Sequence, residues 1–209
     1  MRMLKLASLM VSFSLLIPVA SAQNFAKPVA TDQVSAPDAA PTRAAVRKAL
    51  AARREHNLAG FHTYRTGGVY PHHYVRPGPL NTWRDRDGHL CAAATMIDLD
   101  GQHELVSKTA DANNQIRLLN ITDGALMDWV LTSGFTLEEI DRIQEPGFRP
   151  EQPVQNWQAQ EDARLAKDYA ATETWLGKHA KDGLDSATER LMQNPELAKK
   201  LVDGETATI

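Results

Sequence analysis

The chain has 209 residues, of which 43% are hydrophobic and 23% charged, with one cysteine and a formal net charge of −3. This composition is ordinary for a globular protein and excludes a collagen, a low-complexity chain and a disulfide-rich scaffold. It indicates no function, but the length fits one domain of average size with additional segments.

The N-terminus has the features of a cleaved secretory signal. Arg2 and Lys5 form a positive region, a mostly apolar run follows at 6–19, and residues 20–22 are the small ones that a signal peptidase recognises. The apolar run is shorter than the ~20 residues that cross a bilayer, which makes a transmembrane anchor the weaker interpretation. We therefore expect residues 1–22 to be a signal peptide and the protein to be exported, periplasmic or secreted, with no transmembrane anchor after cleavage.

The charge of the chain bears on whether it binds nucleic acid, and its cysteine count bears on whether it forms a disulfide. Cleavage would remove two basic residues and leave 21 basic against 26 acidic ones. Nucleic-acid-binding proteins usually carry a basic surface, so nucleic acid is not expected as a partner. Cys91 is the only cysteine, so it cannot form an intramolecular disulfide. We expect it to be buried, reactive or bonded to another molecule.

The mature chain is predicted to begin with a linker at 23–41, where prolines prevent a helix. A helix is expected at 42–58, because Thr42 can cap it and its alanines favour helix strongly. Its basic residues are expected to form a solvated face, and they are Arg43, Arg47, Lys48, Arg53 and Arg54.

The segment 60–81 is predicted to be an irregular loop, because glycine and proline recur too often for a regular element. It also carries many aromatic side chains, which must pack on the core or contact a ligand. Ordered loops on a scaffold often hold binding residues. The side chains assigned to binding, together with the nearby tryptophan, are Tyr64, Tyr70, His72, His73, Tyr74 and Trp83.

Two Asp-x-Asp-Gly sequences, at 85–88 and 98–101, predict tight turns. The segments 80–84 and 89–97 are expected to form an antiparallel hairpin around the first turn. A helix from Leu90, favoured by three consecutive alanines, is the alternative. Both turns resemble fragments of a calcium loop, but glycine comes fourth instead of sixth and the ligands are too few, which favours plain turns.

The rest of the chain is predicted to be helical. Helices are expected at 102–113 and 122–133, and a third begins at the capping box formed by residues 136–139. Beyond a second linker, two charged helices at 157–181 and 184–202 are expected, with interruptions at Gly183 and Pro195. They are expected to dock on the central domain of the same chain.

The predicted fold class is therefore α+β and mainly helical, with one small antiparallel β-hairpin packed with short helices and a helical C-terminal extension. The expected organisation is a signal peptide (1–22), a disordered linker (23–41), a globular domain (42–146) and the helical extension (147–209).

Two runs at 64–146, VYPHHYVRPGPLNTWRDRDGHLCAAATMI and IRLLNITDGALMDWVLTSGFTLEEIDRIQ, carry a resemblance. This block, about 40% of the chain, resembles exported bacterial proteins of unassigned function. The resemblance implies that the block is the domain proper, with 23–41 and 150–209 as extensions. It implies no activity.

Three functions are weighed. The leading one is a non-catalytic binding or interaction protein without a cofactor, for an unknown protein or small molecule of the cell envelope, because the chain lacks the established catalytic motifs. The second is a thiol-dependent hydrolase or transferase that uses Cys91 at a helix start with His62, His103 or His179 as base. The third is metal binding through His62, His72 and His73, although their spacing matches no established site and no specific metal is expected.

Overall fold

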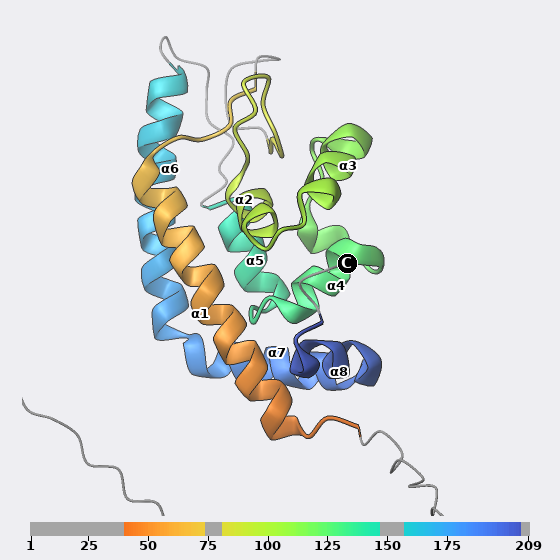
Figure 1. Cartoon of the computed structure of the whole chain (residues 1–209). Coiled ribbons are helices and arrows are strands. Elements are labelled where there is room, and N and C mark those ends of the chain that lie inside the picture. Colours follow the sequence, from red (N-terminus) through yellow and green to blue (C-terminus); the bar gives the residue numbers. More distant parts are fainter. Residues whose placement is uncertain (1–39, 74–80, 147–156, 206–209) are drawn as a thin grey trace, which may run out of the picture. The chain divides into compact units, whose positions relative to one another are not determined.

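The computed structural model describes residues 40–73, 81–146 and 157–205. The predicted signal peptide and most of the first linker lie outside these residues. The described chain is mainly helical, as expected (Figure 1). Its elements are α1 (Arg43–Gly67), α2 (Ala92–Leu99), α3 (His103–Asn113), the 3-10 helix η1 (Leu118–Asn120), α4 (Gly124–Thr132), α5 (Leu137–Gln144), α6 (Trp157–Lys178), α7 (Ala180–Met192) and α8 (Pro195–Asp203).

The predicted β-hairpin, and with it the α+β class, is wrong. Within the described residues there is no strand or sheet, and only an isolated bridge joins Arg84 to Leu90. The chain then enters α2, with Cys91 as the N-cap. Strong helix propensity decides this segment, since three alanines open it. Most of α2 is buried, and a short apolar run of this kind cannot be distinguished from a buried strand by its periodicity. The buried residues of α2 are Ala92, Ala93, Ala94, Met96 and Ile97.

Helix α1 starts where predicted and extends further. Thr42 is its N-cap and accepts a hydrogen bond from a first-turn backbone N–H, and the helix ends at Gly68, whose φ is +66°. Residues 60–67, expected to belong to a loop, are its last two turns. Gly60 lies within these turns, and its missing side chain makes room for Leu99. A Cβ on Gly60 would lie 3.0 Å from a Leu99 methyl group.

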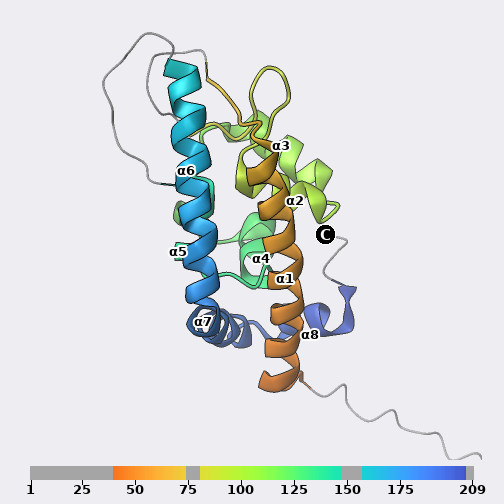
Figure 2. The same ribbon diagram turned by 90° about the vertical axis from the view of Figure 1, so that its left-hand side faces the viewer.

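Two apolar clusters lie along α1. Val46 and Leu50, in its first half, pack with apolar side chains of α7 and α8. Phe61, in its second half, belongs to a larger cluster with α2, α4, α5 and α6. Figures 1 and 2 show α6 running beside α1, with α7 and α8 near the start of α1. The C-terminal helices therefore pack against α1 of the same chain.

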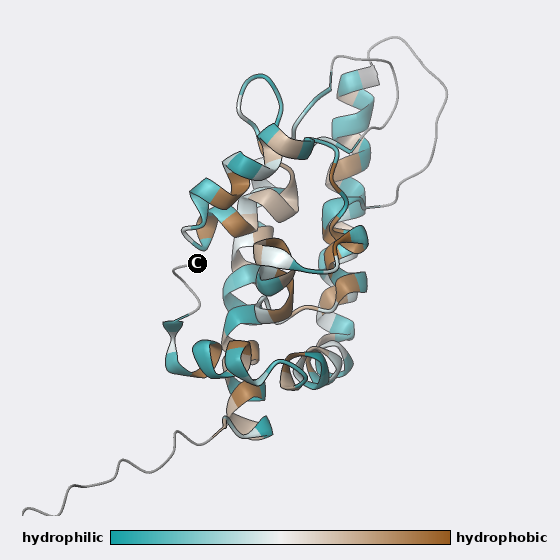
Figure 3. Cartoon of the chain, turned by 90° about the vertical axis from the view of Figure 1, so that its right-hand side faces the viewer, coloured by the Kyte–Doolittle hydropathy of each residue, from teal (hydrophilic) through white to brown (hydrophobic). Residues whose placement is uncertain are grey.

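The predicted capping box is present at the start of α5, where Thr136 and Glu139 exchange hydrogen bonds with each other's backbone N–H. The break expected at Gly183 occurs instead at His179, between α6 and α7. Gly183 lies inside α7, where a Cβ would come within 2.5 Å of a Glu139 carboxylate oxygen. Figure 3 shows hydrophilic and hydrophobic residues alternating along the helices, which is the pattern of helices that bury one face and expose the other.

Candidate functional site

The aromatic residues predicted to bind a ligand belong mainly to the core. The Tyr64 ring lies 5.5 Å from the rings of both Tyr70 and Tyr169. Tyr70 and Trp83 are almost fully buried. The indole N–H of Trp83 donates to the carbonyl of Val106 at 3.1 Å. These rings fasten the segment after α1 to the core, so Tyr64, Tyr70 and Trp83 serve packing in the described part of the chain.

Two of the three predicted histidines, His62 and His72, are held by carboxylates. His72 Nε2 lies 2.8 Å from Asp162 on α6, and His62 Nδ1 lies 2.7 Å from Glu173 on the same helix. His73 is buried, and Tyr74 lies outside the described residues. The structure therefore directs His62 and His72 to different acidic partners instead of to a shared metal position.

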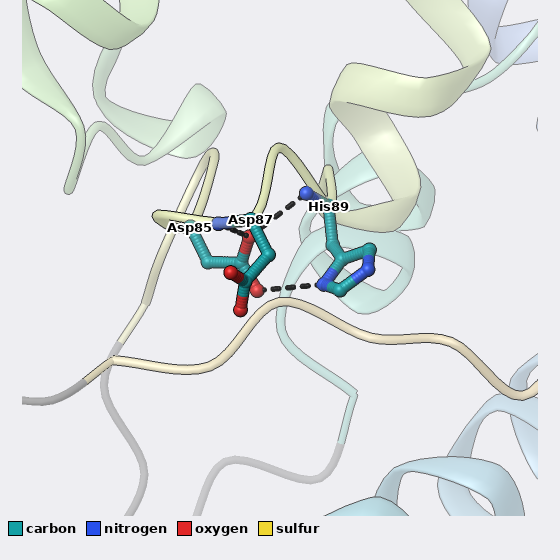
Figure 4. A group of neighbouring side chains, drawn as sticks. All are labelled: Asp85, Asp87 and His89. Carbon is teal, nitrogen blue, oxygen red and sulfur yellow. Dashed lines mark hydrogen bonds and ion pairs between the residues drawn. The ribbon is translucent and has the colours of Figure 1, made fainter.

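Among the described residues, one group has the proximity that a metal ion needs, namely Asp85, Asp87 and His89 (Figure 4). The Asp85 carboxylate is already fully engaged. Its Oδ1 accepts from the backbone N–H of Asp87 and of His89 at 2.9 and 2.8 Å, and its Oδ2 accepts from His89 Nδ1 and from the backbone N–H of His72 at 2.9 and 3.1 Å. Burial raises the pKa of Asp85, but these hydrogen bonds outweigh it and hold the pKa below its usual value. The group closes a turn, and a cation would have to displace these donors.

Cys91 occupies the helix start that a catalytic thiol would need, but in the wrong environment. Its side chain is 3% exposed, and its Sγ accepts a hydrogen bond from Ala94 N at 3.5 Å. Burial raises the pKa of the thiol from 9.0 to about 12, although backbone hydrogen bonds at the helix start lower it. The three histidines considered as its base hydrogen-bond elsewhere: His62 with Glu173, His103 with Asp98, and His179 with the carbonyl of Trp175.

We predict that native Cys91 resists iodoacetamide between pH 7 and 9 and reacts fully in urea, because the buried thiol stays protonated.

The raised pKa of Cys91 also makes the stability of the fold depend on pH. The unfolded thiol ionises above about 9 and the folded one only near 12, so stability is lost as pH rises through this window. Cys91→Ala should lose less stability between pH 8 and 10.5 than the unaltered chain, measured by urea unfolding. Stoichiometric labelling of the native chain at pH 7 would contradict this assignment.

A hollow with mainly apolar walls lies between α1 and α7, and we refer to it as the α1–α7 pocket. Its volume is about 380 Å³, and it is open to solvent. The α1 contributors follow the spacing i, i+3, i+4, i+7, which places them on one face of the helix. The lining residues are Ala51, Arg54, Glu55, Leu58, Ala180, Lys181 and Leu184.

Arg54 fixes the wall of this pocket. It is 4% exposed, so the prediction that it belongs to a solvated face is wrong. Its two Nη atoms bind both oxygens of Glu139 at 2.9 and 2.8 Å and donate to the carbonyls of Gly134 and Leu176, each at 3.0 Å. The guanidinium also lies over the Phe135 ring, 4.7 Å from its centroid. One side chain thus connects α1 to the α4–α5 turn, to α5 and to the end of α6.

The α1–α7 pocket is not predicted by the sequence patterns described above. The one relevant signal is the helical spacing of Ala51 and Leu58, which places both on the same face of α1, whereas the exposed Ala52 lies on another face. Nothing in that signal pairs this face with Ala180 and Leu184, more than a hundred residues later in the chain.

No family model matches this chain, and no curated protein or solved structure is significantly similar to it. Among the described residues, no helix combines the length and apolar composition of a membrane span.

Proposed function

We propose that this chain is an exported, non-catalytic binding protein that receives a small amphipathic molecule in the α1–α7 pocket. The observation that carries the proposal is the pocket itself. Its volume of about 380 Å³ falls in the range of small-molecule sites. Ala51, Leu58 and Leu184 offer an apolar floor, while Glu55 and Lys181 add charge. Such a wall holds an apolar body by burial and orients a polar end.

Rigid walls support a binding role. Arg54 and Glu139 are both nearly inaccessible and form a bidentate pair, which keeps α1 in one position relative to α5. Gly183 lies against the same Glu139 carboxylate, which brings the first turns of α7 close to this pair. A site whose walls are fixed before binding loses little conformational freedom when a ligand enters.

The competing functions receive less support from the same residues. A thiol nucleophile needs an accessible, low-pKa cysteine, whereas Cys91 is buried and its pKa is raised to about 12. A histidine metal site needs His62 and His72 to converge, whereas each binds a separate carboxylate.

Filling the pocket should abolish binding of an apolar probe. We expect the full chain to bind N-phenyl-1-naphthylamine with an increase in its fluorescence, and Ala51→Trp to weaken that binding at least tenfold, because the indole occupies the hollow. Ala52→Trp is the matched control, since Ala52 is the next residue of α1 and its side chain is exposed. It should leave the affinity unchanged.

A second variant, Ala180→Phe, fills the pocket from the α7 side and should act like Ala51→Trp. Circular dichroism and thermal melting establish that each variant is folded. Equal binding by the unaltered chain, both filled variants and Ala52→Trp would contradict the pocket as the binding site.

Export is the other half of the proposal and rests on residues 1–22. Mass spectrometry of the chain recovered from the periplasm or the medium should give a protein that begins at Gln23. Recovery of the unprocessed chain from the cytosol alone would contradict export.

A further inference from the structure

Glu55 lines the α1–α7 pocket and has no counterion in the described part of the chain. Its side chain is exposed, and its carboxylate forms no ion pair or hydrogen bond with the described residues. Residues three and four positions apart on a helix are neighbours on its surface, and all four such neighbours of Glu55 are apolar. They are Ala51, Ala52, Leu58 and Ala59. The pocket therefore carries an acidic group among apolar neighbours.

The two basic residues of the pocket already have acidic partners. The Arg54 guanidinium is almost inaccessible and binds both oxygens of Glu139, so its charge is balanced inside the protein. Lys181 Nζ lies 3.2 Å from Asp185, one turn further along α7. A ligand carboxylate would have to compete with Asp185 for this ammonium group, whereas a ligand cation would find the Glu55 carboxylate without a partner. The unpaired charge of the pocket is therefore negative.

The apolar wall of the pocket strengthens an ionic contact at its edge. Ala51, Leu58 and Leu184 line the pocket, and the apolar body of a ligand would cover them and displace water from beside Glu55. Opposite charges attract more strongly where the effective dielectric constant is lower. Burial of the apolar body and one ionic contact together distinguish an amphipathic cation from neutral and anionic molecules of the same size.

We propose that the α1–α7 pocket selects amphipathic cations, with an ammonium group beside Glu55 and the apolar body over Ala51, Leu58 and Leu184. This inference rests on the proposed binding function and names the chemistry of its ligand. The pocket volume of about 380 Å³ suits an amine with a fused ring system or a short apolar chain.

The test compares three probes that share one ring system and differ in charge. They are the cation 2-(1-naphthyl)ethylamine, the neutral 1-naphthaleneethanol and the anion 1-naphthaleneacetate, each titrated calorimetrically into the full chain. We expect the amine to bind about tenfold more tightly than the carboxylate, with the alcohol between them, because one ionic contact changes sign across the series.

Substitutions at Glu55 identify the group that selects the charge. Glu55→Gln should reduce the preference for the amine to about threefold or less, and Glu55→Lys should reverse it in favour of the carboxylate. Glu55 is exposed and both replacements favour a helix, so both variants should fold, which circular dichroism checks. Glu196→Gln is the matched control, because Glu196 on α8 is also exposed and without an ion pair among the described residues, and it does not line the pocket. It should leave the preference unchanged.

The outcomes separate this inference from the proposed function. Equal affinity for the three probes, with all binding lost in Ala51→Trp, would overturn the selection of cations and leave the binding function standing. Binding of none of them, together with no binding of N-phenyl-1-naphthylamine, would overturn both. Tighter binding of the carboxylate, or a preference for the amine that Glu55→Gln and Glu55→Lys do not change, would contradict the role of Glu55.

Discussion

Arg54→Met is expected to lower the free energy of unfolding by about 3–5 kcal/mol, which is the usual cost of removing one partner of a buried ion pair. The variant would leave the Glu139 carboxylate, 1% exposed, without its bidentate partner. It would also leave the carbonyls of Gly134 and Leu176 without the donors that Arg54 provides. Urea unfolding at pH 7, followed by circular dichroism, measures the change.

Two controls identify the buried pair as the cause. Arg43→Met removes an ion pair with Glu189 in which both side chains are more than half exposed, and it should cost less than about 1 kcal/mol. The double variant Arg54→Met/Glu139→Gln should be more stable than Arg54→Met alone, because no buried charge remains and glutamine can still complete the capping box. A loss of less than 1 kcal/mol in Arg54→Met would contradict the structural role of the pair.

Gly134→Ala is the second substitution with a large expected effect. Gly134 has a φ of +84°, which costs other residues about 1–2 kcal/mol. A Cβ there would also lie 2.4 Å from the Leu50 carbonyl oxygen and 2.7 Å from the backbone nitrogen of Arg54. These are backbone atoms of a helix held on both sides, so relief requires α1 to move away from the α4–α5 turn. We expect a loss of about 3 kcal/mol or more in urea unfolding.

Gly101→Ala separates the contact from the backbone conformation. Gly101 has nearly the same φ, +80°, but a Cβ there would meet nothing within 4 Å. This variant should show only the conformational cost of about 1–2 kcal/mol. Equal losses in the two variants would contradict the close approach of α1 to Gly134. The comparison also bears on binding, because movement of α1 would displace Ala51 and Arg54 in the pocket wall.

Elements with strong local signals could be predicted from the sequence. Thr42 and the capping box of Thr136 and Glu139 set the starts of α1 and α5, because a side chain that satisfies a free N–H acts within one turn. The helices predicted at 102–113 and 122–133 agree with the bounds of α3 and α4 to within two residues. None of these predictions required knowledge of distant contacts.

Segments governed by tertiary contacts could not be predicted in the same way. Recurring glycine and proline predict a loop over 60–81, but the space left by the missing side chain of Gly60 is used by Leu99, and the helix continues to Gly67. Gly183 argued for a break, but it allows Glu139 to approach α7, and the break falls at His179. The same glycine signal indicates a turn or a close contact, and only the neighbour decides between them.

The candidate site depends on the same kind of long-range information. In the sequence Arg54 is one of several basic residues on a helix, and nothing local distinguishes it from Arg53 or Lys48. Its burial follows from pairing with Glu139, 85 residues later. The second wall of the pocket then depends on how α7 packs against α1, which hydrophobic periodicity alone does not specify.

The most direct test of the central claim is a titration of the isotope-labelled full chain with N-phenyl-1-naphthylamine, followed by amide NMR. Saturable shifts concentrated at residues 51–58 and 180–184 are the predicted result. An absence of saturable shifts, or saturable shifts confined to the aromatic segment at 64–73, would contradict the assignment of binding to the α1–α7 pocket.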